Sequence, residues 1–252
     1  MNKKNIFSQD CENIIGRDAE IKSIEDAIGQ PTSSIFYVVG EGGYGKTRLL
    51  RCILEKTKQR NTIDGATKVL ETGVIDLYQS RYLHPVLLMQ AIVRRLRASL
   101  KRHVPEDQPT NYFQNYESQL NTYILRLNNP DPDTGNTMAQ ISQTFIEDYN
   151  QLAHKYPIVC FLDTFEKLHP SIAEVEEYNF RPERRLERWL ADLIGRLDQT
   201  TVVLAGRYRE EQERLLPPLA RAPIQLKTFD EGQTRAYVRS IAAPFEQESD
   251  RI

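Results

Sequence analysis

Short runs of consecutive apolar residues recur along this chain, and they alternate with stretches in which apolar residues return every three or four positions. Continuous runs are typical of strands buried on both faces of a sheet, and the wider spacing is typical of amphipathic helices. The pattern therefore predicts an α/β fold with five strands. The predicted strands are residues 35–39, 72–77, 158–162, 200–205 and 224–229.

Amphipathic helices are predicted before and between these strands, at residues 18–28, 48–58, 86–100, 112–127, 137–154, 181–197 and 232–242. The helices at 112–127 and 137–154 separate the second strand from the third and form a helical insertion over residues 103–155. The first of these two carries an aromatic face of Tyr112, Tyr116 and Tyr123. Such a face is more typical of packing in a core or against a partner than of stacking on a nucleobase.

A glycine-rich loop follows the first strand directly and leads straight into a helix. It matches the whole of the G-x-x-x-x-G-K-[ST] pattern. Its glycines let the backbone approach a phosphate chain, and the N–H groups of the loop and of the helix start form an anion nest. The alternative is a glycine-rich turn beside an unrelated lysine, but the flanking strand and helix favour a nucleotide site. The expected nucleotide-binding residues here are Gly40, Glu41, Gly42, Gly43, Tyr44, Gly45, Lys46, Thr47 and Arg48.

Within this loop two side chains have predicted chemical roles. Lys46 is expected to contact the β- and γ-phosphates as a point charge, and the Thr47 hydroxyl is expected to bind Mg²⁺. The third strand ends in Asp163, the position of a Walker B acid that holds the metal directly or through water. An ordinary helix N-cap after a buried strand is the alternative for Asp163.

Two further residues follow buried strands. Glu166 lies three positions after Asp163, where a carboxylate could polarise an attacking water or simply favour the first turn of a helix. Arg207 follows the fourth strand in Gly206-Arg207, at the same expected rim of the sheet. A planar cation there could contact a γ-phosphate through two hydrogen bonds. A surface arginine, with Arg209 as a competing candidate, is the alternative.

Composition narrows the function classes. The chain has 252 residues and a net charge of −2, so no overall field attracts nucleic acid or a membrane. No apolar run approaches the roughly 20 residues that span a bilayer, and the N-terminus lacks the apolar core of a signal peptide. We therefore expect a cytoplasmic protein. Cys11, Cys52 and Cys160 are far apart in the sequence and predict reduced thiols rather than a disulfide or zinc framework.

A basic cluster ends the helix at 86–100 and could indicate nucleic-acid binding. Interleaved apolar residues and the net charge favour a solvated helix face instead, and cations near a helix C-terminus also offset its dipole. The cluster consists of Arg94, Arg95, Arg97, Lys101, Arg102 and His103.

Five stretches together resemble the nucleotide-binding domain of STAND NTPases, signal-transduction ATPases that are related to AAA+ proteins and include NACHT and NB-ARC types. The P-loop alone is shared by many NTPases, but its combination with Gly16-Arg17, the D-x-x-E strand end at 163–166 and Gly206-Arg207 points to STAND. The resemblance extends from Ile14 to Ala242. The stretches are IIGRDAEIKSIEDAI, GEGGYGKT, IVCFLDTFEKL, VVLAGR and PIQLKTFDEGQTRAYV.

The resemblance implies a three-layer P-loop NTPase fold with a parallel sheet of order 5-1-4-3-2. It places ATP or ADP and Mg²⁺ at the carboxyl ends of the strands. Ile14, Ile15 and Arg17 would lie near the adenine or ribose, and Arg207 would be the sensor arginine. STAND proteins act as switches, in which ADP holds a closed monomer and ATP favours an oligomer that activates an effector, so bacterial signalling or antiphage defence is implied.

The chain also departs from the family pattern. A typical AAA+ site has a second acid directly after the Walker B aspartate, whereas this chain has Thr164, which predicts slow hydrolysis. We expect residues 1–13 to be a tail, 14–243 the nucleotide-binding domain, and 244–252 a truncated link to an absent lid or winged-helix domain. Its partners would then be other copies of the chain or effector and sensor domains outside this sequence.

Two other functions compete with the switch. An AAA+-type motor or loader acting on DNA would show fast, DNA-stimulated turnover, which the near-neutral charge and Thr164 argue against. A pure interaction module with a vestigial P-loop is opposed by the intact Lys46, Thr47 and Asp163. The sequence therefore predicts a nucleotide-dependent switch that needs neither a membrane nor nucleic acid.

Overall fold

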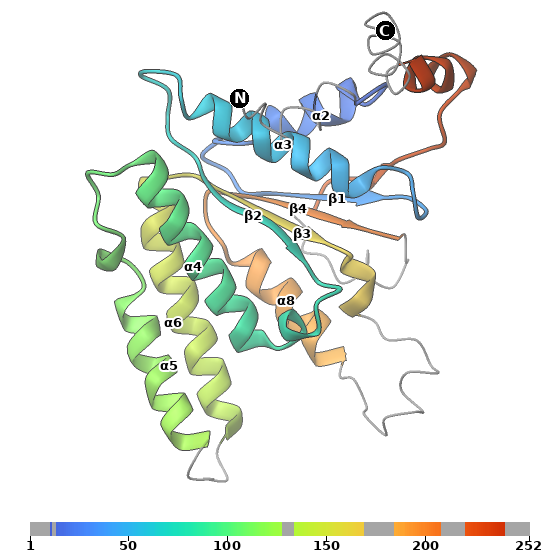
Figure 1. Ribbon diagram of the computed structural model, residues 1–252. Helices are drawn as coiled ribbons and strands as arrows, with labels where there is room; N and C mark the ends of the chain where they lie inside the picture. Colours follow the sequence, from blue (N-terminus) through green and yellow to red (C-terminus); the bar gives the residue numbers. More distant parts are fainter. Residues whose placement is uncertain (1–10, 12–13, 128–133, 169–183, 208–219, 240–252) are drawn as a thin grey trace, which may run out of the picture.

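In the computed structural model, residues 11, 14–127, 134–168, 184–207 and 220–239 are described. They build a five-stranded sheet of order β5-β1-β4-β3-β2 in which every neighbouring pair is parallel. The predicted α/β class and the strand order are therefore confirmed (Figure 1). The strands are β1 (Ser34–Val39), β2 (Leu70–Asp76), β3 (Ile158–Asp163), β4 (Thr200–Gly206) and β5 (Ile224–Gln225).

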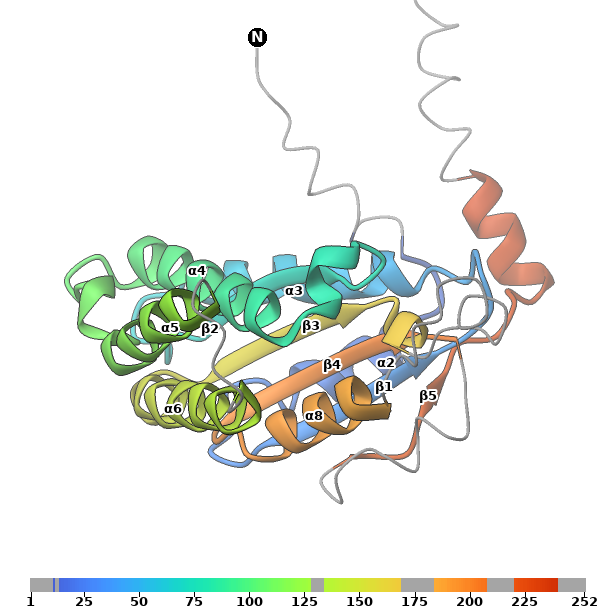
Figure 2. The ribbon, with the colours of Figure 1, turned by 90° about the horizontal axis from the view of Figure 1, so that it is seen from below.

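Helices cover both faces of the sheet because its central strands are buried on both sides. In β1, Ile35, Tyr37 and Val39 pack into the core shared with α4, α6 and α8, whereas Phe36 and Val38 pack against α2 and α3. This alternation is the two-residue period of a strand. Figure 2 looks onto the face covered by α4, α6 and α8. The three helix and sheet layers of the predicted architecture are thus present.

The helices follow the predicted ranges closely. They are α2 (Asp18–Glu25), α3 (Lys46–Arg60), α4 (Pro85–His103), α5 (Gln114–Leu127), α6 (Thr134–Lys155) and α8 (Arg184–Gly195). Residues 231–239 are also helical. Short 3₁₀ helices are η1 (Ser80–Leu83), η2 (Pro109–Asn111) and η3 (Phe165–Leu168). Within these described parts, no helix is both long and apolar enough to cross a membrane.

The aromatic face of α5 is buried, as the sequence predicts. Tyr116 is 1% exposed, and its ring centre lies 5.5 Å from that of Phe145 on α6. Tyr123 is also buried. In Figure 1, α5 lies beside α6 at the edge of the molecule and does not cover the sheet itself. Packing between helices therefore accounts for this aromatic stripe.

The fifth strand is shorter than predicted. Only Ile224 and Gln225 pair with β1, although the apolar pattern predicts a strand over 224–229. Leu226 still donates its N–H to the Val39 carbonyl at 2.8 Å. The chain then leaves the sheet and turns toward the end of the P-loop. The alternating pattern after Leu226 therefore reflects packing in a pocket and not continued strand pairing.

The expectation of three reduced thiols is wrong for two of the cysteines. Cys11 and Cys52 form a disulfide, with Cα atoms 4.8 Å apart. They are 41 residues apart in the sequence, and only the packing of the N-terminal segment on α3 brings them together. Cys160 is a buried free thiol, and burial raises its pKa to about 11. Spacing along the chain gave no sign of this pairing.

The basic end of α4 is partly used inside the molecule. Arg95 donates to the carbonyls of Thr72 and Val74, at 3.0 and 2.8 Å. Arg102 donates to buried Glu71 at 2.5 Å. These two contacts fasten α4 to β2, whereas Arg94, Lys101 and Arg102 remain exposed on the helix surface.

Candidate nucleotide-binding site

The P-loop connects the carboxyl end of β1 to the start of α3. Gly43 and Gly45 both have φ of 85°, a left-handed conformation that favours glycine. Gly45 is the N-cap of α3, so the first N–H groups of that helix point toward the loop. A side-chain carbon added at Gly43 or Gly45 would meet nothing within 4 Å. The loop therefore leaves open space beside its backbone donors, as a phosphate-binding loop requires.

Lys46 is the first residue of α3 and extends back over the P-loop. Its ammonium group donates to the carbonyl of Gly40 at 2.7 Å and to that of Glu41 at 3.0 Å. Neutral carbonyls are weaker partners for a cation than phosphate oxygens, because charge-assisted hydrogen bonds are stronger. This position keeps the Lys46 ammonium group within the loop, where it can bind the oxygens of a bound phosphate.

The metal-binding candidates are joined by a direct hydrogen bond. The Thr47 hydroxyl donates to Oδ2 of Asp163 at 2.6 Å, linking the start of α3 to the end of β3. Mg²⁺ prefers oxygen ligands and is commonly held by one or two carboxylates together with substrate phosphates. These two side chains fit that donor set, and a bound Mg²⁺ would neutralise charge on the phosphate oxygens.

A second carboxylate, which sequence reasoning missed, lies at the same place. Asp76 ends β2 and is in register with Asp163 at the end of β3. Thr164 connects them: its N–H donates to Oδ1 of Asp163 at 2.9 Å and its hydroxyl donates to Asp76 at 2.8 Å. Thr164 holds a φ of 61°, which is unusual for a residue other than glycine. The sequence signal that could have identified Asp76 is its position as the acid at the end of a predicted strand, because parallel strands end at the same edge of the sheet.

The environment of Asp163 changes its acidity. Burial raises its pKa, and the charge of Asp76 acts in the same direction. The hydrogen bonds from Thr47 and Thr164 and the charge of Lys46 lower it, but the net direction is upward. A divalent cation would reverse this balance because it stabilises the ionised carboxylate. Metal binding and proton release at Asp163 are thus expected to be linked.

Glu166 and Arg207 lie together at the rim of the sheet. The Arg207 N–H donates to Oε2 of Glu166 at 3.1 Å, and the Arg207 Nε lies 3.9 Å from Oε1. The absence of a side chain at Gly206 allows this approach, since a carbon added there would lie 2.7 Å from the carboxylate. A carbon added at Gly42 would lie 3.6 Å from the Arg207 guanidinium. Arg207 therefore lies between the P-loop and Glu166.

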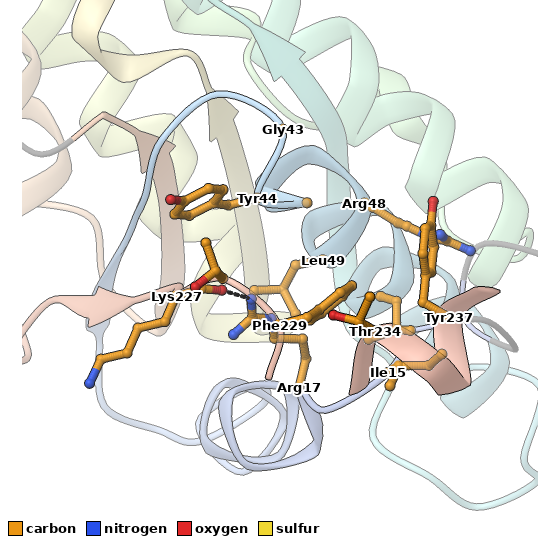
Figure 3. Close-up of a pocket in the computed structure, with 13 residues that line it drawn as sticks. Ile15, Arg17, Gly43, Tyr44, Arg48, Leu49, Lys227, Phe229, Thr234 and Tyr237 are labelled. Atoms are coloured by element: carbon orange, nitrogen blue, oxygen red, sulfur yellow. Dashed lines mark hydrogen bonds between the residues drawn. The ribbon is translucent and has the colours of Figure 1, made fainter. Parts of the chain in front are cut away.

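A cavity of about 520 Å³ opens beside the P-loop, in the size range of small-molecule sites (Figure 3). The sequence predicted seven of its lining residues, and the others come from α3 and the segment after β5. The predicted ones are Ile14, Ile15, Arg17, Gly43, Tyr44, Gly45 and Arg48. The additional ones are Leu49, Lys227, Thr228, Phe229, Thr234 and Tyr237.

Arg17 contacts the segment that follows β5 at this cavity. Its guanidinium donates to the Lys227 carbonyl at 2.5 Å and lies 5.5 Å from the centre of the Phe229 ring. The Phe229 and Tyr237 ring centres are 5.8 Å apart. Aromatic and aliphatic walls near a phosphate-binding loop suit the flat apolar body of a nucleobase. The contacts of Arg17 with Lys227 and Phe229 hold the wall that follows β5 against the start of α2.

A second cavity of about 540 Å³ lies on the other side of the start of α3. Its lining includes Thr47, Asp76, Asp163 and Thr164, the oxygen donors described above. Among the described residues, no group of three or more His, Cys, Asp or Glu side chains could hold a metal on its own. The donors fit a cation that takes its remaining ligands from phosphate or water. One cavity thus suits a base, and the other suits a metal with the terminal phosphate.

Comparison with solved structures gives relatives of similar fold at low identity. Drosophila ORC bound to DNA has a TM-score of 0.52 at 14% identity, over 94% of this chain and 51% of that chain. The E. coli MS115-1 HORMA:CdnC:Trip13 complex has a TM-score of 0.51 at 10% identity, over 94% and 71%. Aeropyrum pernix ORC2, solved in ADPNP-ADP complexes, has a TM-score of 0.48 at 14% identity, over 92% and 52%.

The chain spans about half the length of the two ORC proteins. A comparison with curated protein sequences finds no match. The AAA ATPase domain family matches residues 13–175, which is most of the chain and includes the P-loop, Asp163 and Glu166. On this match and on the parallel sheet that carries the P-loop, the chain belongs to the AAA ATPase domain family.

Proposed function

We propose that this chain is the nucleotide-binding domain of a STAND-type switch. It binds ATP or ADP with Mg²⁺ at the P-loop, hydrolyses ATP slowly, and changes its assembly with the nucleotide. The observation that carries the proposal is the wall of the base cavity. Lys227, Phe229, Thr234 and Tyr237 all follow the last strand, and the last two lie on the helix of residues 231–239. A base in this cavity would fix that segment against the P-loop.

This arrangement supplies a physical route from nucleotide to assembly. A ligand shifts a conformational equilibrium only through unequal affinity for the two states. Phe229 and Tyr237 belong to the last part of the described chain, and the family places a lid and further domains beyond it. A nucleotide that holds these two side chains against Arg17 would therefore favour one position of the lid and of the domains that follow it.

The γ-phosphate is the group that distinguishes ATP from ADP in this proposal. Arg207 lies between the P-loop and Glu166, where its guanidinium pairs with the glutamate. A γ-phosphate carries more charge than one carboxylate and would compete for that guanidinium. ATP would then draw the Arg207 guanidinium away from Oε1 of Glu166, and ADP would leave it there, while the Arg207 backbone N–H stays bonded to Oε2 in both states.

Slow hydrolysis is consistent with the positions of the carboxylates. Thr164 stands where typical AAA+ proteins have a second acid, and Glu166 is occupied by the Arg207 N–H. That bond comes from the Arg207 backbone and uses Oε2 of Glu166, whereas Oε1 lies 3.9 Å from the Arg207 Nε. Asp76 already accepts a hydrogen bond from Thr164. We infer that this site hydrolyses bound ATP slowly, so that the ATP-bound state is long-lived, as a switch requires and a motor does not.

The partners in this proposal are other copies of the chain or effector and sensor domains, in bacterial signalling or antiphage defence. Nucleic acid is not a required partner, since the arginines that fasten α4 are used internally. The DNA in the Drosophila ORC structure belongs to that complex, and the likeness to it concerns the fold alone. A motor acting on DNA is the alternative that the experiment below separates.

The experiment is a measurement of molecular mass by light scattering, with ADP or with a non-hydrolysable ATP analogue, each with Mg²⁺. We expect a monomer with ADP and a larger assembly with the analogue, because only the analogue engages Arg207. ATP turnover is measured on the same samples with and without duplex DNA. An unchanged mass together with turnover that rises severalfold on DNA would replace the switch with the motor.

A further inference from the structure

A third cavity, unrelated to the P-loop, lies between α4 and α5. It has a volume of about 500 Å³ and shares no lining residue with the two cavities beside the P-loop. Its walls come from η1, α4 and the first half of α5. We name it the α4–α5 groove, and its lining residues are Arg81, Tyr82, Leu87, Gln90, Ala91, Val93, Arg94, Arg97, Tyr116, Glu117 and Leu120.

Two buried polar atoms in this groove have no hydrogen-bond partner within the part of the chain that is described. They are the hydroxyl of Tyr116 and the Nε of Arg97. Tyr116 is 1% exposed, so bulk water does not satisfy its hydroxyl. The hydroxyl of Tyr82, also buried, faces the side chains of Arg95 and Arg81, which can donate to its oxygen. Buried polar groups are nearly always paired, since leaving one unpaired is unfavourable. Two such atoms beside one cavity are the first sign that the cavity takes a ligand with hydrogen-bond acceptors.

The groove also carries unbalanced positive charge. Arg94 is exposed and makes no ion pair or hydrogen bond within the described residues. Glu117 is the acid in the lining, and the terminal nitrogens of Arg97 already engage its carboxylate. Burial alone would raise the pKa of Tyr82, but nearby Arg95 and Arg81 lower it below its usual value. The missing partner must therefore bring negative charge and hydrogen-bond acceptors.

Part of the groove is apolar. Leu87 is a large hydrophobic residue that is 43% exposed, and Ala91 and Leu120 line the same cavity. Burying such surface against a ligand is favourable in proportion to its area. A simple inorganic anion would satisfy the arginine but would leave the Leu87 side chain in water, since Ala91 and Leu120 are already buried. The chemistry of the groove therefore suits a molecule with a charged head and an apolar body.

We propose that the α4–α5 groove binds a small organic anion, a carboxylate or phosphate carried on an apolar or aromatic body. Arg94 and the Arg97 Nε contact the anionic head, the two tyrosine hydroxyls donate to its oxygen atoms, and Leu87 and Leu120 cover its body. The volume is that of small-ligand sites. A helix of a partner protein fits less well, because its backbone cannot enter far enough to reach the buried tyrosine hydroxyls.

The test uses 8-anilinonaphthalene-1-sulfonate, a fluorescent anion on an aromatic body, titrated into the full chain. Wild-type protein is expected to bind it saturably. Arg94→Gln should weaken binding about tenfold through the loss of a charged hydrogen bond, and Tyr116→Phe about threefold through the loss of a neutral one. Arg94 is exposed and Tyr116→Phe keeps the ring, so both variants should retain the wild-type circular dichroism spectrum.

Two matched variants control for position. Lys101→Gln removes a cation from the other end of α4, and Tyr123→Phe removes a phenol from α5 outside the groove. Both should bind the dye like wild type. Equal affinity in all four variants, or no saturable binding by wild type, would overturn the proposal. This result does not depend on nucleotide, so it stands or falls separately from the proposed switch.

Competition then identifies the anionic head. Displacement of the dye by phenylacetate assigns a carboxylate, and displacement by phenyl phosphate assigns a phosphate. Either result supports the groove as a small-ligand site when Arg94→Gln weakens the competitor as well. Displacement by an acidic amphipathic helical peptide, with no effect of either small anion, would overturn it and assign the groove to a protein partner.

Discussion

Replacement of Lys46 by alanine is expected to abolish measurable binding of ADP and ATP while leaving the protein folded. The ammonium group already lies within the P-loop, 2.7 Å from the Gly40 carbonyl, and it is the cation closest to where the phosphates would lie. Loss of charged hydrogen bonds to two phosphates corresponds to a loss of affinity of about a hundredfold or more. The folded state loses two hydrogen bonds from the ammonium group to carbonyls, at a cost of about 1.5 kcal/mol each.

The measurement is calorimetric titration of each nucleotide into the variant, with circular dichroism melting to confirm the fold. Lys101→Ala is the matched control, because it removes a lysine at the end of α4, next to the Arg102 that pairs with Glu71 near the start of β2. That end of the sheet is opposite the P-loop. Wild-type affinity in Lys46→Ala would show that the cavity beside the P-loop is not the nucleotide site.

Replacement of Glu166 by glutamine is expected to leave nucleotide binding intact but to slow ATP turnover by about a hundredfold, the usual contribution of a general base. Glutamine keeps an oxygen that can accept the Arg207 N–H, now 3.1 Å from the carboxylate, so the local structure should survive. It cannot take a proton from water at neutral pH. The variant should therefore remain in the ATP-bound state and show a larger assembly with ATP itself.

Single-turnover hydrolysis of bound ATP separates this chemical step from binding and product release. Glu147→Gln serves as the control, since Glu147 is an exposed residue on α6 that interacts with Gln143 one helical turn away. It should hydrolyse ATP at the wild-type rate. If Glu166→Gln does so as well, Glu166 only stabilises the turn after β3, and Asp76 becomes the acid to test next.

Local pattern was enough to predict most of the fold. Strands β1, β3 and β4 are fully buried, so each appears in the sequence as a continuous apolar run. The P-loop is recognisable because its glycines and lysine are adjacent in the chain. Gly43 and Gly45 are indeed in the left-handed conformation that only glycine adopts easily. The strand order came from family resemblance, since spacing along the chain does not determine which strands pair.

The features that sequence reasoning missed depend on contacts between distant residues. Phe229 and Tyr237 line the base cavity only because the chain leaves the sheet after Leu226, while the alternating pattern there predicted a longer strand. Asp76 reaches Asp163 only because β2 and β3 are neighbours in register. Cys11 and Cys52 meet only through the packing on α3. Each of these is a property of the tertiary structure.

The pairing of Arg207 with Glu166 was predicted only in part. Both residues were candidates from the ends of buried strands, but their mutual contact requires Gly206, where a side chain would lie 2.7 Å from the carboxylate. We propose that the Arg207 guanidinium contacts the γ-phosphate and so leaves Oε1 of Glu166, while the Arg207 backbone N–H stays bonded to Oε2. Arg209, the competing candidate, lies outside the described residues.

Calorimetric titration of wild-type protein with ADP and with a non-hydrolysable ATP analogue, both with Mg²⁺, tests the central claim most directly. The claim is that one site beside the P-loop binds adenine nucleotides and distinguishes the γ-phosphate. We predict one site per chain for each nucleotide, with affinities that differ at least tenfold and become equal when Arg207 is replaced by alanine. Absence of binding, or equal affinities in the wild type, would contradict the account.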